Sequence, residues 1–308
     1  MKKILLIVFI ASVSYVHAQD ETVKKLQADA TRTIKKDEKD TVNKVWKKGG
    51  LFSLNLAQAS LTNWAAGGED YSLSINALLS TYLFYKKGLN SWDNTLDFNL
   101  GYLNTTSLGS RKNDDRLDFL SKFGHQIARN LNLAALFNFR TQLFKGYTYT
   151  DTARILSSSF MSPAYILLGI GLDYKPNDRF SIYLSPATVR WIIVKNDSLA
   201  AKGLYGVDPG KHTKMEFGAF ASISYVNEFN KIFAYKGRLD LFSNYSHNPQ
   251  NVDLYMTNIL TVKLSKVLSA SWNVDLIYDD DSKLFGKNHN SPALQVKSLV
   301  GIGVLFHF

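Results

Sequence analysis

The chain has 308 residues, no cysteine, 20% charged residues and a formal net charge of +10 at pH 7. Without cysteine, disulfide bonds and a lipid anchor attached to a cysteine are excluded. The positive charge does not indicate a nucleic-acid partner, because lysine and arginine are spread along the chain and form no basic helix or stripe. No motif predicts a cofactor.

The N-terminus predicts export. Lysines follow Met1, an apolar run covers 4–13, and Val16-His17-Ala18 has the small-x-small spacing of a cleavage site, so 1–18 reads as a signal peptide. Residues 19–50 are rich in lysine, aspartate, glutamate and threonine. That composition predicts a flexible N-terminal segment in the periplasm.

From Leu51 onward the apolar residues alternate with polar ones, which is the pattern of strands with two different faces. Most of these runs exceed the roughly 9–11 residues that a tilted strand needs to cross a bilayer. Residues 51–308 are therefore predicted to form a transmembrane antiparallel β-barrel of about 12 strands. The twelve predicted strands are 51–61, 71–85, 91–104, 115–128, 131–144, 164–174, 179–194, 214–227, 233–246, 252–266, 269–279 and 294–308.

The connections between these runs alternate in length. Those at 62–70, 105–114, 145–163, 195–213 and 280–293 are long, the connections between them are short, and 247–251 is short where a long one is due. Short periplasmic turns and longer extracellular loops are typical of barrels in the outer membrane of Gram-negative bacteria. Outer-membrane lipid is then the surrounding medium.

Aromatic residues lie at both ends of the apolar face, as Tyr71 and Tyr85 do in the second run and Trp272 and Tyr278 in the eleventh. This placement predicts two interfacial girdles. Pro186 interrupts the run 179–194, so we expect a break in strand pairing near it.

The last run ends on Val304, Phe306 and Phe308, which alternate on the outward face. These positions resemble the C-terminal signal by which the barrel-assembly machinery recognises outer-membrane barrels. That machinery is therefore an expected partner during insertion.

A further resemblance involves Trp46, Gly49-Gly50 and the stretch Asn63-Trp64-Ala65-Ala66-Gly67-Gly68, with 184–188 as a second point of similarity. These residues resemble a family of functionally uncharacterised outer-membrane proteins. The resemblance implies a barrel and supplies no catalytic residues. From the residues themselves, Gly67 and Gly68 suit a turn with positive φ. For Trp64 we favour an interfacial residue over the alternative, a ligand-binding aromatic residue.

The alternation places thirteen charged residues of the strands on the inner face, six basic and seven acidic. This mixture predicts paired charges that brace the wall in preference to the ring of one sign found in a selective pore. A barrel of twelve strands lies between the filled interior of about 8 strands and the aqueous channel of 16–18. The predicted charge network comprises Asp97, Arg116, Asp118, Lys122, Arg140, Arg238, Asp240 and Asp275.

Catalytic and metal sites have weak support. His125 lies on the predicted outward face, where an interfacial histidine is the default and a lipid-facing active site the alternative. Asp279, Asp280 and Asp281, with asparagines at 288 and 290, offer oxygen ligands for calcium, yet without ordered spacing they read as a solvated acidic loop. We expect neither a bound metal nor an enzyme.

Three functions remain open at this stage. The first is a narrow channel or transport protein for small polar solutes. The second is a non-conducting scaffold or accessory subunit of an outer-membrane assembly, for which loops 145–163 and 195–213, or the segment 19–50, would contact an unidentified protein partner. The third is a barrel-wall lipid hydrolase.

Overall fold

The computed structural model describes residues 45–60, 69–149, 153–177, 179–230, 232–265, 268–281 and 291–307. The predicted signal peptide, most of the predicted periplasmic segment, the motif from Asn63 to Gly68 and Phe308 lie outside the described residues, as do positions 288 and 290 of the acidic loop. The elements are β1 (Trp46–Ser60), β2 (Tyr71–Lys87), β3 (Asn90–Thr105), β4 (Gly109–Ala128), β5 (Leu131–Thr141), β6 (Gly146–Tyr149), β7 (Arg154–Ser158), β8 (Ala164–Asn177), β9 (Phe180–Ile193), α3 (Asp197–Ala201), η1 (Leu204–Gly206), β10 (Thr213–Glu228), β11 (Phe233–Asn244), β12 (Val252–Lys263), β13 (Leu268–Tyr278) and β14 (Gln295–His307).

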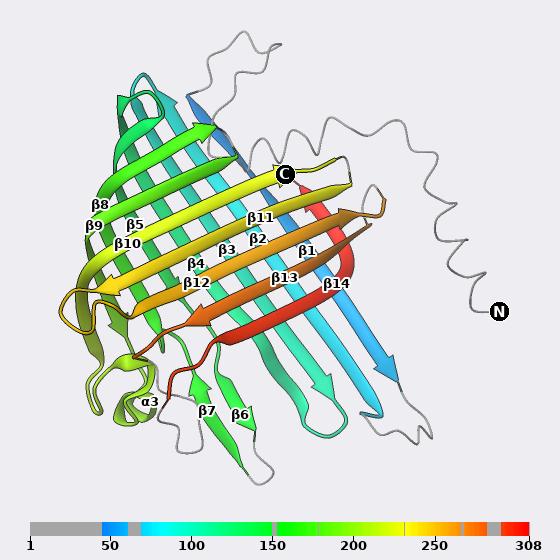
Figure 1. Cartoon of the computed structure of the whole chain (residues 1–308). Helices are drawn as coiled ribbons and strands as arrows, with labels where there is room; N and C mark the ends of the chain where they lie inside the picture. Colours follow the sequence, from blue (N-terminus) through cyan, green and yellow to red (C-terminus); the bar gives the residue numbers. More distant parts are fainter. Residues whose placement is uncertain are drawn as a thin grey trace.

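Twelve of these strands close into one antiparallel barrel in the order β1-β14-β13-β12-β11-β10-β9-β8-β5-β4-β3-β2 (Figure 1). The predicted fold class and strand number are thereby confirmed. Barrel strands that follow one another in the chain are neighbours in the barrel, joined alternately by short turns at one end and by loops at the other. In the part of the chain that the structure describes, no helix has the length and apolar composition needed to cross a membrane.

Strand β1 begins five residues earlier than the sequence predicted. It pairs with β2 from Trp46↔Tyr85 onward, so positions 46–50, assigned above to the periplasmic segment, belong to the barrel. Two lysines and two glycines at 47–50 interrupt the alternation of apolar and polar residues, so this part of the strand was not predicted. The Trp46 ring, however, lies 4.9 Å from that of Tyr85 and 6.2 Å from that of Trp92, which anchors it to the wall.

Two of the long loops contain structure that the sequence did not predict. β6 and β7 form a separate hairpin in 145–163, and α3 and η1 occupy 195–213. The loops pack against the end of the barrel through a cluster whose buried members are Ile192, Val194, Leu199, Ala200 and Val207. We refer to this end as the long-loop end and to the opposite one as the short-turn end.

The expected irregularity at Pro186 is present. The register of β8 with β9 shifts between Ile170 and Leu172, and that of β10 with β9 shifts between Gly218 and Phe220. Pro186 has no amide hydrogen to donate to a neighbour. The Ser185 hydroxyl donates instead to the Ile170 carbonyl over 2.8 Å, which satisfies an acceptor that the broken ladder leaves free.

The outer wall is apolar along its length. Exposed aliphatic side chains include Leu56, Ile75, Leu83, Leu133, Leu168, Ile170, Leu172, Leu184, Val300 and Ile302. The indole nitrogens of Trp92 and Trp272 donate to Ser121 and Ser298 at 2.8 and 2.9 Å, so these polar groups are satisfied on the wall itself. A barrel surface of this kind suits a hydrocarbon environment.

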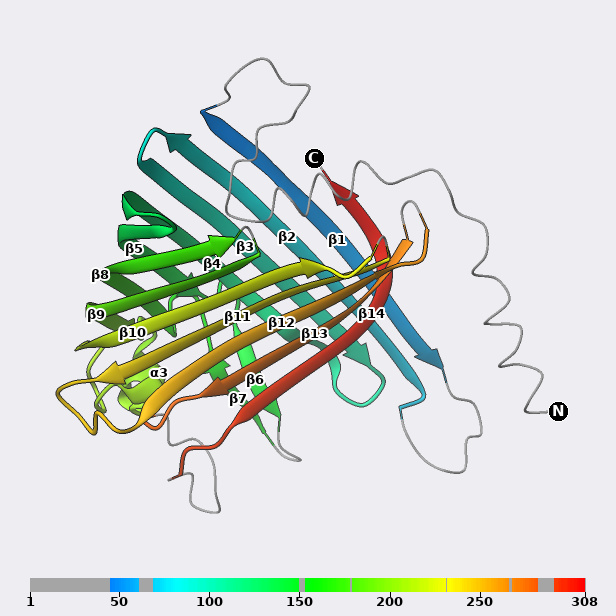
Figure 2. The same ribbon diagram turned by 45° about the horizontal axis from the view of Figure 1, so that its top comes forward.

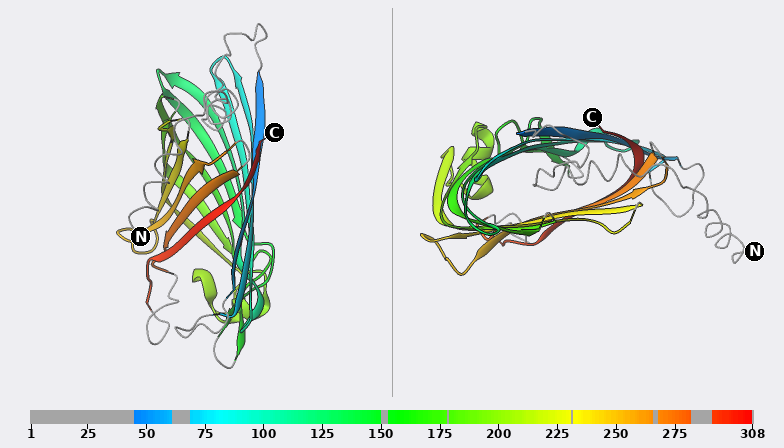
Figure 3. Two further views of the ribbon diagram at one scale, coloured as in Figure 1. Left: turned by 90° about the vertical axis from the view of Figure 1, so that its right-hand side faces the viewer. Right: turned by 90° about the horizontal axis from the view of Figure 1, so that it is seen from above.

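The barrel is flattened, as the view from above in Figure 3 shows. At one edge of the flattened section the lumen is filled by a cluster of buried side chains from β4, β5 and β8 to β11: Leu120, Ala134, Leu136, Leu167, Tyr183, Phe220 and Phe242. At the other edge, towards β1 and β12 to β14, the lumen holds a cavity. Charged side chains lie between these two regions.

Candidate functional site in the barrel lumen

A cluster of charged side chains joins the two broad walls at the middle of the lumen. Arg140 of β5 donates to Asp118 Oδ2 of β4 from Nε at 3.0 Å and from Nη2 at 2.8 Å. Its Nη2 also lies 3.4 Å from Asp240 Oδ2 on β11, in the opposite wall. Arg238 of β11 in turn donates from Nε to Asp240 Oδ1 over 2.9 Å.

Arg116 extends this central cluster towards β12 and β13. Its Nη1 donates to the Tyr255 hydroxyl and lies 3.4 Å from Asp275 Oδ1. The Tyr255 ring carries the Arg140 guanidinium on its face, 3.7 Å from the ring centroid. An aromatic ring between two arginines relieves part of their repulsion, because its face is negative.

The central cluster is electrically balanced. Three arginines (Arg116, Arg140 and Arg238) face three carboxylates (Asp118, Asp240 and Asp275). A ring of one sign, which would attract one kind of ion, is not formed by these six side chains. The geometry is that of a cross-brace, which holds two sheets at a fixed separation.

A second network lies nearer the short-turn end, on β3, β4 and β8. Lys122 Nζ is 2.6 Å from Asp173 Oδ1, and Lys175 Nζ is 3.1 Å from Asp173 Oδ2 and 3.0 Å from Asp93 Oδ2. The Lys122 and Asp173 side chains are only 1% and 3% exposed. Such buried charges persist because they are paired.

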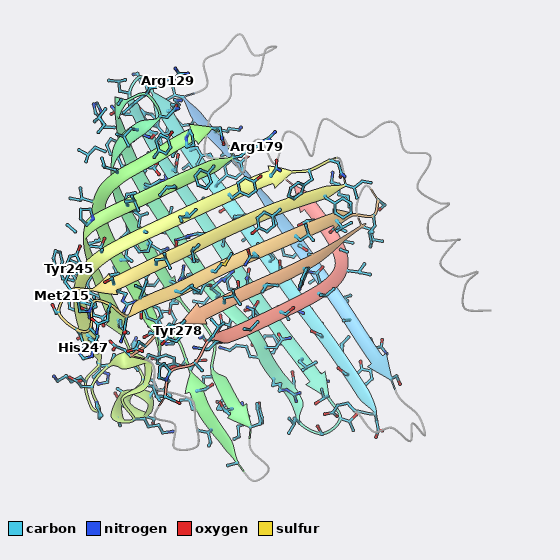
Figure 4. The ribbon with its side chains drawn as sticks, viewed as in Figure 1. Arg129, Arg179, Met215, Tyr245, His247 and Tyr278 are labelled. Carbon is cyan, nitrogen blue, oxygen red and sulfur yellow. The ribbon has the colours of Figure 1, made fainter. Side chains whose placement is uncertain are left out.

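A third network crosses the lumen at the long-loop end. Arg190 of β9 binds Glu216 of β10 and Asp253 of β12, with its Nη2 at 2.5 and 2.6 Å from their oxygens. Lys214 continues it to Asp281, 2.7 Å away. In Figure 4 the labelled residues Met215, Tyr245, His247 and Tyr278 mark the long-loop end, and Arg129 and Arg179 mark the short-turn end.

The acidic loop that follows β13 is part of this third network. Burial and the nearby charge of Asp253 raise the pKa of Asp279 to about 6. Burial alone would also raise the pKa of Asp281, but the hydrogen bond and charge of Lys214 outweigh it and lower that pKa. No cluster of metal-ligating side chains occurs among the residues that the structure describes.

A large cavity occupies the hollow edge of the lumen between the short turns and the central cluster. It encloses about 1630 Å³, counting its open mouth. Asn230 and Ile232 line it at the short-turn end, and Arg116 and Tyr255 at its inner end. A second cavity of about 450 Å³ lies beyond Arg116 and includes Asp275 and Lys297. Six residues line both cavities, and Arg116 is the charged one among them.

The structure places all eight side chains of the predicted charge network on the inner face, each in an ion pair. Asp97, which lies opposite Asp118 on the neighbouring strand, accepts from the Ser80 hydroxyl at 2.5 Å and lies 3.8 Å from Lys236. Strand alternation also puts Lys297 inside, and it was overlooked. Arg190 was missed because the irregularity at Pro186 shifts the inner face by one residue. The side chains that reach the networks without having been predicted are Asp114, Lys175, Arg190, Lys214, Asp253, Tyr255 and Lys297.

His125 lies on the outer wall, where its Nδ1 is 2.7 Å from Asn90 Oδ1. Its outward-facing neighbours on β4 are Phe123 and Ile127, and the residue opposite on β5 is Leu133. These three side chains offer no nucleophile for a hydrolase. In the insertion signal, Val304 pairs with Leu54 of β1 and position 306 pairs with Phe52.

Comparison with known proteins gives a match to one family over part of the chain. Residues 56–147 match a family described as proteins of unknown function (DUF3078). The resemblance to an uncharacterised family is confirmed over this segment. None of the curated proteins matches the chain.

Three solved structures illustrate the similarity of shape. An outer membrane channel from Pseudomonas putida F1 has a TM-score of 0.39 and 10% identity, with 90% of this chain and 100% of that chain covered. The NanC porin has a TM-score of 0.38 and 7% identity, covering 82% and 98%. Outer membrane phospholipase A from Escherichia coli has a TM-score of 0.37 and 11% identity, covering 91% and 97%. Similarities this weak decide nothing about activity.

The location rests on the architecture itself. A closed antiparallel barrel with an apolar outer wall, a charged interior and alternating short and long connections is the form of bacterial outer-membrane proteins. The expected place of the chain, the outer membrane of a Gram-negative bacterium, is confirmed on this ground. The short-turn end then faces the periplasm.

Proposed function

We propose that the protein is a narrow outer-membrane channel for small polar solutes, held nearly closed at mid-depth by the central cluster. The observation that supports this proposal is the position of Arg116, which lines the large periplasmic cavity and the smaller cavity beyond it. The same side chain bridges the lumen to Tyr255 and Asp275. A solute that reaches the inner end of the periplasmic cavity therefore meets the Arg116 guanidinium before the smaller cavity.

Two features favour a polar solute. The charges that border the passage are of both signs, with no ring of one sign among them, which does not favour one kind of ion strongly. Serine, threonine and asparagine side chains alternate with the charged ones along the wall of the large cavity, among them Ser53, Ser80, Thr257 and Asn273. These groups replace part of the hydration shell of a polar solute.

Single-channel conductance of the refolded protein in planar bilayers tests the proposal. The Arg116→Ala variant should show discrete steps several-fold larger than those of the wild type, because removal of the side chain joins the two cavities. Arg129→Ala is the matched control, since Arg129 is exposed in a periplasmic turn and lines neither cavity. The absence of steps from both the wild type and Arg116→Ala, with the barrel shown to be folded by heat-modifiable migration, would refute a channel.

The second candidate is a non-conducting scaffold, favoured by the order in the long loops. The Tyr205 hydroxyl donates to the Ser157 carbonyl, joining the two loops into one surface. Burial raises the pKa of Tyr205 to about 12, so this phenol stays protonated and able to donate. A protein that co-purifies with the wild type but not with a variant lacking the hairpin Gly146 to Ser158 would support this candidate.

A further inference from the structure

The barrel closes incompletely between its first and last strands. β1 pairs with β2 at fifteen positions from Trp46 to Ser60, but with β14 at only five, from Leu51↔His307 to Asn55↔Gly303. β14 pairs with β13 as far as Gln295. Among the residues that the structure describes, positions 56–60 of β1 therefore pair only with β2, and 295–302 of β14 pair only with β13. Figures 1 and 2 both show the two strands meeting near the C-terminal end of β14 and diverging towards the long-loop end.

This open part of the seam lies within the apolar belt. Val296, Val300 and Ile302 of β14 and Leu56 of β1 are 62%, 74%, 55% and 57% exposed on the outer wall. A bilayer offers no hydrogen bonds to unpaired backbone groups, which makes an open strand edge costly there unless something polar reaches it. A polar group from the outer leaflet that reached this edge would therefore lower the free energy by hydrogen-bonding the unpaired backbone groups.

The smaller cavity lies where the two strands separate. Asn55 is the last residue of β1 that pairs with β14. Lys297 and Leu299 belong to the part of β14 that does not pair with β1. All three residues line the cavity.

The polar groups of this cavity are charge-balanced and partly unsatisfied. Asp275 lies 2.9 Å from Lys297 and 3.4 Å from Arg116, and Asp114 lies 3.0 Å from Lys297. Three buried atoms of its lining have no hydrogen-bond partner in the part of the chain that the structure describes: the amide oxygens of Asn76 and Asn273 and Nε of Arg116. Two orphan acceptors and one orphan donor suit a ligand that both donates and accepts hydrogen bonds.

We propose that the open seam between β1 and β14 is a lateral entrance from the outer leaflet, and that the cavity behind it binds the neutral, hydroxyl-bearing head group of an amphiphile. A hydroxyl group donates to the amide oxygens and accepts from the guanidinium Nε–H. The apolar tail stays in the bilayer against Val300 and Ile302. Because the two pairs of opposite charges cancel, a charged head group gains no net attraction. The binding site does not require that the lumen conduct.

The geometry of the seam is tested by disulfide formation, which the cysteine-free chain allows without background. Continuing the observed register would place Leu56 opposite Ile302, just beyond the last observed pair. On oxidation in phosphatidylcholine vesicles, Leu54→Cys with Val304→Cys should cross-link, since these positions are paired, and Leu56→Cys with Ile302→Cys should not. Equal cross-linking of the two pairs would show a closed seam and overturn the proposal.

Binding is tested with an octyl glucoside that carries a photoactivatable diazirine next to its head group, added to the full-length mature protein in the same vesicles. Mass spectrometry should find adducts on inward-facing residues around Asn55, Asn76 and Leu299. Asn76→Leu should reduce these adducts at least five-fold, whereas Gln58→Leu, on the exposed outer side of the same seam, should leave them unchanged.

The outcomes of the labelling distinguish this site from the channel. Adducts confined to outward-facing residues all round the barrel would mean lipid contact only and would overturn the proposal. Equal labelling by a probe with the same tail and a sulfate head group would also overturn it, since the cavity would not select a neutral head. Adducts at the predicted residues in a protein that does not conduct would support the site while refuting the channel.

Discussion

Replacing Asp173 with asparagine should destabilise the barrel more than replacing Lys122 with methionine. Asp173 is the shared partner of two lysines, with oxygens 2.6 Å from Lys122 Nζ and 3.1 Å from Lys175 Nζ. The Lys122 side chain is 1% exposed, so Asp173→Asn leaves its buried ammonium group without this carboxylate. Breaking a buried pair by removal of one partner costs about 3–5 kcal/mol.

The two single variants differ because of Lys175. After Lys122→Met, Asp173 keeps Lys175, so the cost should lie at about 2–3 kcal/mol, below that of Asp173→Asn at about 3–5 kcal/mol. Combining the two substitutions should cost less than the sum of the single effects, because no unpaired charge of that pair remains.

Urea-induced unfolding of the refolded barrel in vesicles, followed by tryptophan fluorescence, measures these differences. Lys211→Met is the matched control. Its partner Asp208 is 3.0 Å away, but both side chains are about 70% exposed, and exposed pairs contribute about 0–1 kcal/mol. If Asp173→Asn changed the free energy of unfolding no more than Lys211→Met does, the reasoning about the buried network would be wrong.

Two further predictions concern the acidic loop and the break in the wall. Because the folded barrel raises the pKa of Asp279 from 3.8 to about 6, it binds this proton more tightly than the unfolded chain, and stability falls as the pH rises through that interval. Asp279→Asn should therefore be more stable than the wild type at pH 7.5 and equal to it near pH 3, below the unfolded-state pKa. An equal difference at both pH values would contradict this. Gly171→Ala should reduce folding yield and cost about 1–3 kcal/mol, because its Cβ would lie 2.0 Å from the Leu184 carbonyl oxygen, whereas Gly124→Ala, with its nearest contact at 3.1 Å, serves as the milder control in the same urea assay.

Alternation along single strands was enough to predict which side chains face inward. Arg116 and Asp118 share the inner face of one strand, as do Arg238 and Asp240 of another, and period-two geometry decides this before any tertiary contact forms. Where a strand departs from the regular period the prediction failed. Arg190 follows the irregularity at Pro186, which shifts the inner face by one residue.

The sequence does not indicate which of the inward-facing charged residues form ion pairs with one another. Arg116 and Asp275 are 159 positions apart, and Arg140 and Asp240 are 100 apart. Their contact depends on the flattening of the barrel, which brings β4 and β5 close to β11 and β13. A round barrel of the same twelve strands would hold the same inward side chains apart.

The sequence by itself determined the strand number, the alternation of short and long connections and the two faces of the wall, because these follow from local periodicity and turn residues. Only the tertiary structure decided that half of the lumen is filled, that Arg116 lines two cavities, and that β1 and β14 separate after Asn55 and Gly303. The physical reason is that these features depend on the curvature and closure of the whole sheet. Curvature and closure arise from twelve strands acting together and are encoded in no single one of them.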